Sequence, residues 1–313
     1  MSTGNFNYYW NWFVEWIADG DASLRASSRV YAFEKTPYQS VMVVELVSLG
    51  KTLIIDGKVQ SSLYDEHIYH ESLVHPPLIT HGLPEKVLIL GGGEGATLRE
   101  VLRYRTVREV HMVDIDEKVV EFSRNFLKEW HRGAFDDPRT RIIIADGRKF
   151  VEEAAARGEK YDAVIIDLVD PLSGGPAVKL YTREFYHLIG KILEDDGVMV
   201  TQATSPILYQ RMYAVILNTV ASAFSIARPY LTYIRSYNGP WGFVYGSNKK
   251  DPLALQPEEI NKRISSLLST PSELKFYDGE THEALFKITK NIRDGLKSWR
   301  EVSTDESPKY IDI

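Results

Sequence analysis

The fold follows from one stretch of sequence, Val87-Leu-Ile-Leu-Gly-Gly-Gly-Glu-Gly-Ala-Thr-Leu-Arg-Glu-Val-Leu102. Its apolar start, residues 87–90, predicts a buried parallel strand, and residues 96–102 predict the first turns of a helix. The glycine turn between them allows positive φ angles and lets a ligand approach the backbone closely. This strand–turn–helix unit is typical of an open α/β sheet that binds an adenosine-like ligand.

A second apolar run follows about one strand and one helix later and ends in acids, Val110-His-Met-Val-Asp114-Ile-Asp116. In such sheets, an acid at the tip of the strand after the glycine turn binds the ribose hydroxyls. The glycine turn alone is a weak signal, but the two features at this spacing are specific. We therefore expect Asp114 to bind ribose.

Strands and helices alternate after Pro84 as in a doubly wound sheet. Strands are predicted at 86–90, 109–114, 140–144, 163–167 and 197–202, with two more at 227–236 and 241–246. Helices are predicted to begin near Ala96, Glu117, Arg148, Thr182 and Pro206. Right-handed crossovers place the carboxyl ends of the strands on one rim. The polar residues after the strands should therefore converge, namely Glu94, Asp114, Asp146, Asp167 and Gln202.

The N-terminal part has a different pattern, with short alternating runs at 29–34, 40–46 and 51–55 separated by turn signals. These runs predict a small antiparallel sheet, followed by a helix over 65–78 and a boundary at Gly82-Leu-Pro84. We predict an N-terminal β domain, residues 1–82, and a Rossmann-like, methyltransferase-type catalytic domain, residues 83–313. Residues 303–313 should form a tail that packs on the body. Packing is also the role predicted for three tryptophans, Trp10, Trp12 and Trp16.

Composition excludes several classes of protein. The 313 residues are 44% hydrophobic and 26% charged, as in an ordinary globular protein, and the net charge of −6 argues against nucleic acid. The absence of cysteine excludes disulfides, thiolate metal sites and a cysteine nucleophile. No run reaches the roughly 18 apolar residues of a membrane span, and the N-terminus lacks the pattern of a signal peptide. We expect a cytoplasmic protein.

Two carboxylates, Asp167 and Asp170, follow the fourth strand of the doubly wound sheet and precede a Gly/Pro stretch, Leu172-Ser-Gly-Gly-Pro176. Close like charges repel each other and raise one pKa, so such a pair favours binding of a cation, above all an amine. The Gly/Pro stretch is suited to a mobile lid. The alternative is a helix N-cap beside a solvated acid.

Acids near the glycine turn bear on the ligand. Asp146-Gly147 alone would indicate a turn, but in register with Asp114 it predicts a contact with the adenine amino group. Glu94, within the glycine turn, would repel the carboxylate of S-adenosylmethionine, which methyltransferases bind on this sheet. It would attract a cosubstrate that has lost the carboxylate and kept the amine.

The histidines of the N-terminal helix, His67, His70 and His75, are spaced over different helix faces, so we predict no metal site. Tyr69 and His70 are instead predicted to form hydrogen bonds at the mouth of the site. The alternative for both residues is plain helix surface.

These motifs resemble those of the polyamine aminopropyltransferases, the spermidine synthase family, over nearly the whole chain. The matching stretches are Pro37-Tyr-Gln39, Leu53-Ile-Ile-Asp-Gly57 with Gln60, Asp65-Glu66, Tyr69-His-Glu71, Gly91 to Glu100, Val113-Asp-Ile-Asp116, Asp146-Gly147, Asp167-Leu-Val-Asp-Pro171, Leu180-Tyr-Thr-Arg-Glu-Phe-Tyr186 and Thr201-Gln202. The resemblance implies transfer of an aminopropyl group from decarboxylated S-adenosylmethionine to a small amine, with release of 5′-methylthioadenosine. It implies no cofactor and a homodimer or homotetramer formed through the β domain.

The resemblance also implies roles for individual residues. For the donor, Gln39 and Asp114 would bind the ribose region, and Asp146 and Gly147 would bind the adenine. His70 and Glu94 would bind the amine of the aminopropyl group. For the acceptor, Tyr69 and Asp170 would position the amine, and Asp167 would accept its proton. Gln60, Gln202 and Tyr237 complete the predicted substrate-binding set. Glu94 and Gly174-Gly-Pro176 resemble the thermospermine and agmatine branches, so putrescine, agmatine and spermidine all remain candidate acceptors.

Two other functions are compatible with this fold. One is a methyltransferase that uses S-adenosylmethionine, and the other is a catalytically silent ligand-binding or assembly module. The paired acids and Glu94 favour aminopropyl transfer over methyl transfer, and the complete set of acids argues against a silent module.

Overall fold

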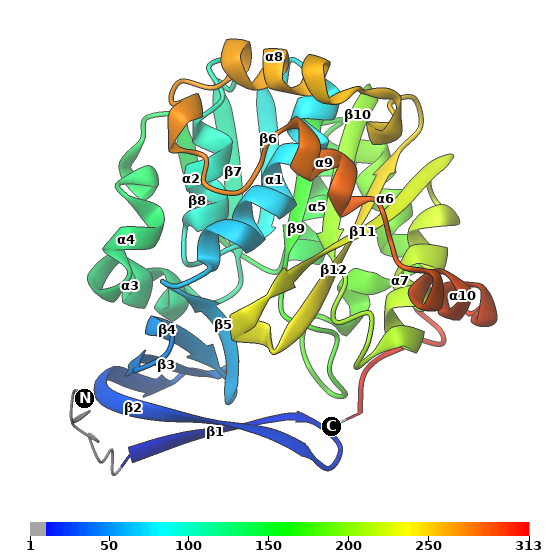
Figure 1. Ribbon diagram of the computed structural model, residues 1–313. Helices are drawn as coiled ribbons and strands as arrows, with labels where there is room; N and C mark the ends of the chain where they lie inside the picture. Colours follow the sequence, from blue (N-terminus) through cyan, green and yellow to red (C-terminus); the bar gives the residue numbers. More distant parts are fainter. Residues whose placement is uncertain (1–10, 313) are drawn as a thin grey trace, which may run out of the picture. The chain divides into compact units, whose positions relative to one another are not determined.

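The computed structural model describes residues 11–312, which form two units (Figure 1). The β unit comprises the chain up to Glu66 together with Arg235–Asn238, and the α/β unit comprises His67–Ile234 and the chain from Gly239 onward. The predicted boundary at Gly82 therefore lies one helix later than the division in the structure. Helix α1 (Glu66–His81) is bonded to distant parts of the α/β unit, for example by the Tyr230 hydroxyl, which donates to the Ser72 carbonyl.

The β unit contains one antiparallel sheet with five strands in sequence order. The strands are β1 (Asn11–Ala18), β2 (Asp21–Lys35), β3 (Ser40–Leu46), β4 (Gly50–Ile55) and β5 (Lys58–Ser62). Their alternating apolar residues form a small core that includes Val44, Leu46 and Ile54. The three predicted strands are present, whereas β1 and β5 were not predicted. In β1 a buried carboxylate, Glu15, interrupts the apolar alternation and is paired with Arg25 at 2.6 Å.

A short segment from the second half of the chain completes the β unit. The segment η3 (Arg235–Tyr237) donates the Ser236 N–H to Asp65 Oδ2 at 2.8 Å, and Arg25 donates to the Ser236 carbonyl at 3.0 Å. For this reason the strand predicted to run to Ser236 ends two residues earlier, at Ile234.

The α/β unit is built on a seven-stranded sheet in the order β11-β12-β10-β9-β6-β7-β8. The strands are β6 (Lys86–Gly91), β7 (Glu109–Asp114), β8 (Thr140–Ile144), β9 (Tyr161–Asp167), β10 (Leu193–Gln202), β11 (Ile226–Ile234) and β12 (Gly239–Ser247). The first five are parallel, and β12 is antiparallel to both of its neighbours. This confirms the predicted doubly wound α/β class. The order reverses beside β6, so the ligand rim of such a sheet is expected at the carboxyl ends of β6 and β9.

Helices lie on both faces of this sheet, with α1 and α9 on one face and α5 and α6 on the other (Figure 1). The remaining helical bounds are α2 (Ala96–Leu102), α3 (Glu117–Phe126), α4 (Lys128–His131), α5 (Gly147–Ala156), α6 (Arg183–Ile192), α7 (Gln210–Ala221), α8 (Pro257–Leu267), α9 (Gly279–Leu285) and α10 (Lys290–Ser298). Within residues 11–312, no helix has both the length and the apolar character that crossing a bilayer requires.

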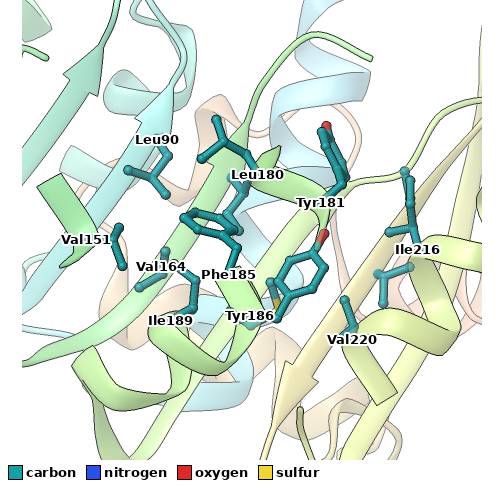
Figure 2. Close-up of a cluster of buried hydrophobic side chains, with 14 of the residues drawn as sticks. Leu90, Val151, Val164, Leu180, Tyr181, Phe185, Tyr186, Ile189, Ile216 and Val220 are labelled. Carbon is teal, nitrogen blue, oxygen red and sulfur yellow. The ribbon is translucent and has the colours of Figure 1, made fainter. Parts of the chain in front are cut away.

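The main core lies between the sheet and α6. Figure 2 shows Phe185 and Ile189 of α6 packed among Leu90 of β6, Val164 of β9 and Val151 of α5. The buried residues of this cluster are at most 9% exposed, and Val164, Phe185 and Ile189 are fully buried. Close packing of this kind fixes the strand ends, and with them the polar residues that follow the strands.

The C-terminal tail packs on the α/β unit, as predicted. The Arg183 N–H donates to the Ser303 carbonyl at 2.8 Å. Farther on, Ile311 forms a parallel bridge with Leu172, with its N–H bonded to the Pro171 carbonyl at 2.9 Å. The Ser173 N–H donates back to the Ile311 carbonyl at 2.9 Å. The predicted lid after Asp170 is therefore attached at its first residues to the tail.

An ion pair also holds the tail and gives a stability prediction. Asp305 accepts two bonds from Arg148, at 2.7 and 2.5 Å, and one from Thr182 at 2.7 Å. Asp305→Ala should lower the free energy of unfolding by about 1–2 kcal/mol at pH 7, measured by chemical denaturation. Arg148 lowers the pKa of Asp305, so this contribution is complete above the unfolded value near 4 and is lost as pH falls below it.

Asp294→Ala is the matched control, because Asp294 pairs with Lys290 along one exposed face of α10. Exposed helical ion pairs contribute little to stability, because water and salt screen them. Equal losses in the two variants would show that Asp305 does not anchor the tail.

Candidate active site

The glycine turn and the end of β9 lie in direct contact. Gly91 pairs with Asp167 in the parallel register, and the Gly92 N–H donates to the Asp167 carbonyl at 3.0 Å. A Cβ atom at Gly91 would lie 2.1 Å from the Asp167 carbonyl oxygen, and the residue has φ +82°. Glycine is therefore required there both for space and for backbone conformation.

Asp114 lies against the same turn from the end of β7. A Cβ atom at Gly93 would lie 2.7 Å from Asp114 Oδ2, while Asp114 Oδ1 accepts the Asp116 N–H at 2.9 Å. Burial raises the pKa of Asp114 to about 6, with further contributions from the charges of Asp116, Glu94 and Asp167. The predicted ribose ligand is thus at the sheet rim, beside the glycine turn.

Asp167 is held by two hydroxyl groups. The Tyr69 hydroxyl donates to Oδ1 at 2.7 Å, and the Thr97 hydroxyl donates to Oδ2 at 2.6 Å. Burial raises the pKa of Asp167 to about 6, and the charge of Glu94 raises it further, whereas His70 and the two hydroxyls act in the opposite direction. A carboxylate with this pKa is ionised at neutral pH and yet basic enough to accept a proton.

His70 and Glu94 form the other side of the cluster. His70 is fully buried, and its Nε2 lies 2.8 Å from Glu94 Oε1. One ligating atom from each of His70, Glu94 and Asp167 lies within 4.8 Å of the others. The three residues can therefore share one cation, either an ammonium group or a metal ion. The prediction of hydrogen-bonding roles for Tyr69 and His70 agrees with this geometry, and plain helix surface does not.

Asp170 lies beyond Asp167 and is oriented by the end of β10. Gln202 Nε2 donates to Asp170 Oδ1 at 3.1 Å, and the Thr204 hydroxyl donates to Oδ2 at 3.3 Å. Gln202 is 1% exposed, and its Nε2 also lies 2.9 Å from the Leu168 carbonyl. The alternative of a helix N-cap beside a solvated acid is thus wrong, because both acids accept side-chain bonds within the α/β unit.

Asp146 is the N-cap of α5. Its Oδ1 accepts the N–H groups of Arg148 at 2.9 Å and Lys149 at 3.1 Å, and Gly147 is the first helical residue. The carboxylate is exposed at the end of the strand next to β7. Capping explains one carboxylate oxygen, and the predicted contact with adenine remains a prediction.

Three predicted residues belong to the β unit and are described within it. The Gln39 carbonyl accepts the Thr36 N–H at 2.8 Å and thereby closes the turn before β3. The Gln60 carbonyl accepts a bond from the Tyr237 hydroxyl, which joins β5 to the segment at Arg235–Tyr237. Their roles in substrate binding remain predictions.

Sequence reasoning did not identify Thr97 and Thr204 as site residues. Thr97 had a usable signal, because it is the second residue of the helix that follows the glycine turn, on the ligand rim. Thr204 had none, because its contact with Asp170 depends on a left-handed backbone angle, φ +59°, that no motif indicates.

Comparison with known proteins places this geometry in a family. Residues 66–256 match the spermine/spermidine synthase domain family. A polyamine aminopropyltransferase 2 from Hyperthermus butylicus is 50% identical over 97% of this chain and 98% of its own length. A polyamine aminopropyltransferase from Sulfurisphaera tokodaii is 47% identical over 97% of this chain and 99% of its own length.

Solved structures agree with the sequence relatives. A spermidine synthase in complex with the transition-state analogue AdoDATO superposes with a TM-score of 0.86 at 31% identity, over 93% of this chain and 96% of that one. Spermidine synthase from Thermotoga maritima gives a TM-score of 0.83 at 31% identity, over 92% and 94%. The chain belongs to the spermine/spermidine synthase family of polyamine aminopropyltransferases.

Proposed function

We propose that the protein transfers the aminopropyl group of decarboxylated S-adenosylmethionine to a small primary amine. The observation that carries the proposal is the convergence of Glu94, Asp114 and Asp167 on the glycine turn, with His70 bonded to Glu94. Burial raises the pKa of Asp114 and of Asp167, and the charge of Glu94 raises both further. A cationic ligand beside these carboxylates favours their charged forms. The AdoDATO complex of the similar spermidine synthase supports this choice of donor.

The donor is placed by its charged and polar ends. Asp114 accepts hydrogen bonds from the ribose hydroxyls, and the adenine lies toward Asp146 and Gly147. The aminopropyl ammonium lies between His70 and Glu94, whose nitrogen and oxygen are 2.8 Å apart in the free protein and can separate around it. This orientation leaves the sulfonium and its adjacent methylene beside Asp167.

The acceptor approaches from the side of Asp170. A primary amine has a pKa near 10, so it arrives as an ammonium ion and must lose a proton before it can attack. Asp170 holds the cation, Tyr69 fixes the Asp167 carboxylate through their 2.7 Å bond, and Asp167 accepts the proton. The neutral nitrogen then attacks the methylene, the carbon–sulfur bond breaks, and its electron pair leaves on the sulfur of methylthioadenosine.

A turnover assay with a panel of acceptors tests the proposal. Purified protein is incubated with decarboxylated S-adenosylmethionine and putrescine, agmatine, cadaverine or spermidine, and methylthioadenosine is quantified. At least one amine should stimulate its release far above the rate without amine. Release that is equal with and without every amine would overturn the proposed transfer, and the ranking of the four identifies the acceptor.

The proposed ribose contact gives a binding prediction. Asp114→Ala should weaken methylthioadenosine binding by about 1.5–3 kcal/mol, measured by calorimetry, because charge-assisted hydrogen bonds are lost. The control is Asp116→Ala, which removes the N-cap of α3, a 3.0 Å bond to the Lys118 N–H. That variant should lose about 1 kcal/mol of stability with little change in affinity. Normal binding by Asp114→Ala would place the ribose elsewhere.

We also propose that the β unit pairs with a second copy of the chain. Trp12 and Trp16 are 58% and 61% exposed on one face of β1, and between them Val14 is opposite Leu24 of β2, which is 66% exposed. The exposure of these two tryptophans does not support the predicted packing role within residues 11–312, and Trp10 lies outside that range. A contiguous apolar face of this kind indicates an interface with another protein surface.

The double variant Trp12→Ser/Trp16→Ser should therefore weaken self-association at least tenfold, measured by light scattering over a concentration series. Each large apolar side chain contributes roughly 1.5–3 kcal/mol when buried. Leu83→Ser is the control, because Leu83 is 66% exposed in a loop of the α/β unit. If both variants keep the mass of the native protein at every concentration, the hairpin face is not the interface.

A further inference from the structure

One buried threonine has a backbone conformation that its side chain disfavours. Thr204 has φ +59° and is fully buried. Within residues 11–312, the other non-glycine residues with positive φ are Asp56, Arg132 and Asn238. Asp and Asn tolerate this region, whereas a β-branched residue there is an outlier. Such outliers persist where the surrounding structure determines them, and they concentrate at functional sites.

Backbone hydrogen bonds hold Thr204 in this conformation. Its carbonyl accepts the Gly242 N–H at 2.8 Å, and the N–H of the preceding residue, Ala203, donates to the Gly242 carbonyl at 2.8 Å. A Cβ atom at Gly242 would lie 2.5 Å from the Tyr213 ring. Strand β12 can therefore pack this closely against Tyr213 only with glycine at position 242. The end of β10 is thus fixed against β12 on both sides of the strained residue.

The conformation places two groups of Thr204 where they act on Asp170. The hydroxyl donates directly to Asp170 Oδ2 at 3.3 Å. The N–H donates to Gln202 Oε1 at 2.9 Å, which fixes which end of the Gln202 amide carries oxygen. The Gln202 Nε2 must then face Asp170 Oδ1, at 3.1 Å. Both oxygens of Asp170 are thereby oriented, one by the hydroxyl and the other through the glutamine amide.

We propose that Thr204 is a positioning residue for the acceptor amine, acting through Asp170. The proposal rests on the proposed function, in which Asp170 holds the acceptor as an ammonium ion. It adds a reason for the strained backbone: residue 204 supplies a hydroxyl to one carboxylate oxygen and sets the amide that binds the other. The acceptor therefore meets a carboxylate with a fixed direction, although Thr204 itself does not touch the reacting atoms.

Thr204→Val tests the hydroxyl, because valine keeps the β-branched shape and the backbone but cannot donate. The Michaelis constant for the best acceptor should rise about threefold to tenfold, the scale of one typical hydrogen bond, while the turnover rate stays within about twofold. Affinity for methylthioadenosine should not change. Thr204→Ser, which keeps the hydroxyl, should restore the Michaelis constant of the native protein.

Thr80→Val is the matched control for loss of a buried hydroxyl. Thr80 is 5% exposed and donates to the Pro76 carbonyl one turn earlier in α1, at 2.7 Å. This control should leave both kinetic constants unchanged. A merely structural role of Thr204 would instead lower the melting temperature and alter the turnover rate and nucleoside affinity together, and that pattern would overturn the proposal.

A double-mutant cycle with Asp170→Asn decides whether Thr204 acts through Asp170. The double variant should have the same Michaelis constant as Asp170→Asn alone, because the partner of the hydroxyl has already lost its charge. Independent, multiplying effects would contradict the proposal, and so would an unchanged constant in Thr204→Val. If Asp170→Asn alone has no effect, the assignment of Asp170 fails and the role of Thr204 fails with it. Should Thr204→Val not fold, Thr204→Ala enters the same cycle.

Discussion

Asp167→Asn should lower the turnover rate by about two to four orders of magnitude, the usual contribution of a positioned general base. Asparagine keeps the shape of the side chain and can still accept one of the hydrogen bonds from Tyr69 and Thr97, at 2.7 and 2.6 Å in the native protein. Its NH2 group donates at the other position, where the hydroxyl must turn to accept. Asparagine cannot accept the proton of the ammonium ion. Affinity for the donor should change far less than the turnover rate, measured in single-turnover experiments.

The pH dependence separates this loss from a folding defect. With a pKa of about 6, Asp167 is protonated progressively as pH falls through 6, so kcat/KM of the native protein should fall there. In Asp167→Asn, kcat/KM should not show this fall near pH 6. The activity of the variant should recover in part toward pH 10, where more of the amine arrives deprotonated. Because this pKa is raised above its unfolded value near 4, ionised Asp167 opposes folding above pH 6. The variant should therefore melt no lower than the native protein at pH 8.

Asp170→Asn is the matched variant, because Asp170 lies three residues after Asp167, the last residue of β9. An anchor acts on the bound cation more than on the barrier, so this change should raise the Michaelis constant for the amine with a smaller effect on turnover. The different partners of the two acids support the distinction, because Asp167 accepts from Tyr69 and Asp170 from Gln202. If the two variants exchange phenotypes, the assignments of base and anchor are reversed.

The second large effect concerns the donor. Decarboxylated S-adenosylmethionine should bind at least about a hundredfold more tightly than S-adenosylmethionine, because a carboxylate placed among Glu94, Asp114 and Asp167 costs several kcal/mol. Burial is the largest cause of the raised pKa of Asp114 and of Asp167, and the charge of Glu94 raises both further. Calorimetric titration of the native protein with both compounds measures the ratio.

Glu94→Gln shows which acid is responsible. In the native protein, His70 Nε2 lies 2.8 Å from Glu94 Oε1. The variant keeps a hydrogen-bond acceptor at this position but removes the negative charge. Its affinity for the decarboxylated donor should fall and its affinity for the carboxylated form should rise. The ratio of the two affinities should therefore be smaller than in the native protein. Equal affinities of the native protein for the two compounds would contradict the role of Glu94 and favour the methyltransferase alternative.

The convergence of acids could be predicted because it depends on local rules. Parallel strands joined by right-handed crossovers have their carboxyl ends on one rim, so Asp114 and Asp167 had to lie near the glycine turn once the strands were located. Strand β12 (Gly239–Ser247) also includes the predicted range 241–246, whose aromatic and β-branched residues favour a strand. Such features depend only on the residues of single segments and on the order of those segments along the chain.

The domain boundary could not be predicted in this way. Glu71, in α1, accepts the N–H groups of Lys275, Phe276 and Tyr277 at 2.9, 2.9 and 2.8 Å. That contact joins residues about 200 positions apart and holds the helix in the α/β unit. The local sequence pattern around Glu71 does not indicate this contact. The turn at Gly82 was the stronger local signal for a domain boundary.

Strand β1 and Thr204 show two further limits. Glu15 occupies a buried position of β1 because Arg25 neutralises it, and a polar residue at an inward position hides the strand period. Thr204 has a left-handed backbone because the chain around it is fixed by Gly242, which follows it by 38 positions. Both depend on partners that become neighbours only in the folded chain.

Product analysis of a single reaction tests the central claim most directly. The protein is incubated with the preferred amine and an equimolar mixture of S-adenosylmethionine and its decarboxylated form, and all nucleoside and amine products are quantified. Aminopropyl transfer predicts methylthioadenosine and aminopropylated amine in equal amounts, with no S-adenosylhomocysteine. Formation of S-adenosylhomocysteine together with a methylated amine, and no aminopropylated product, would contradict the account.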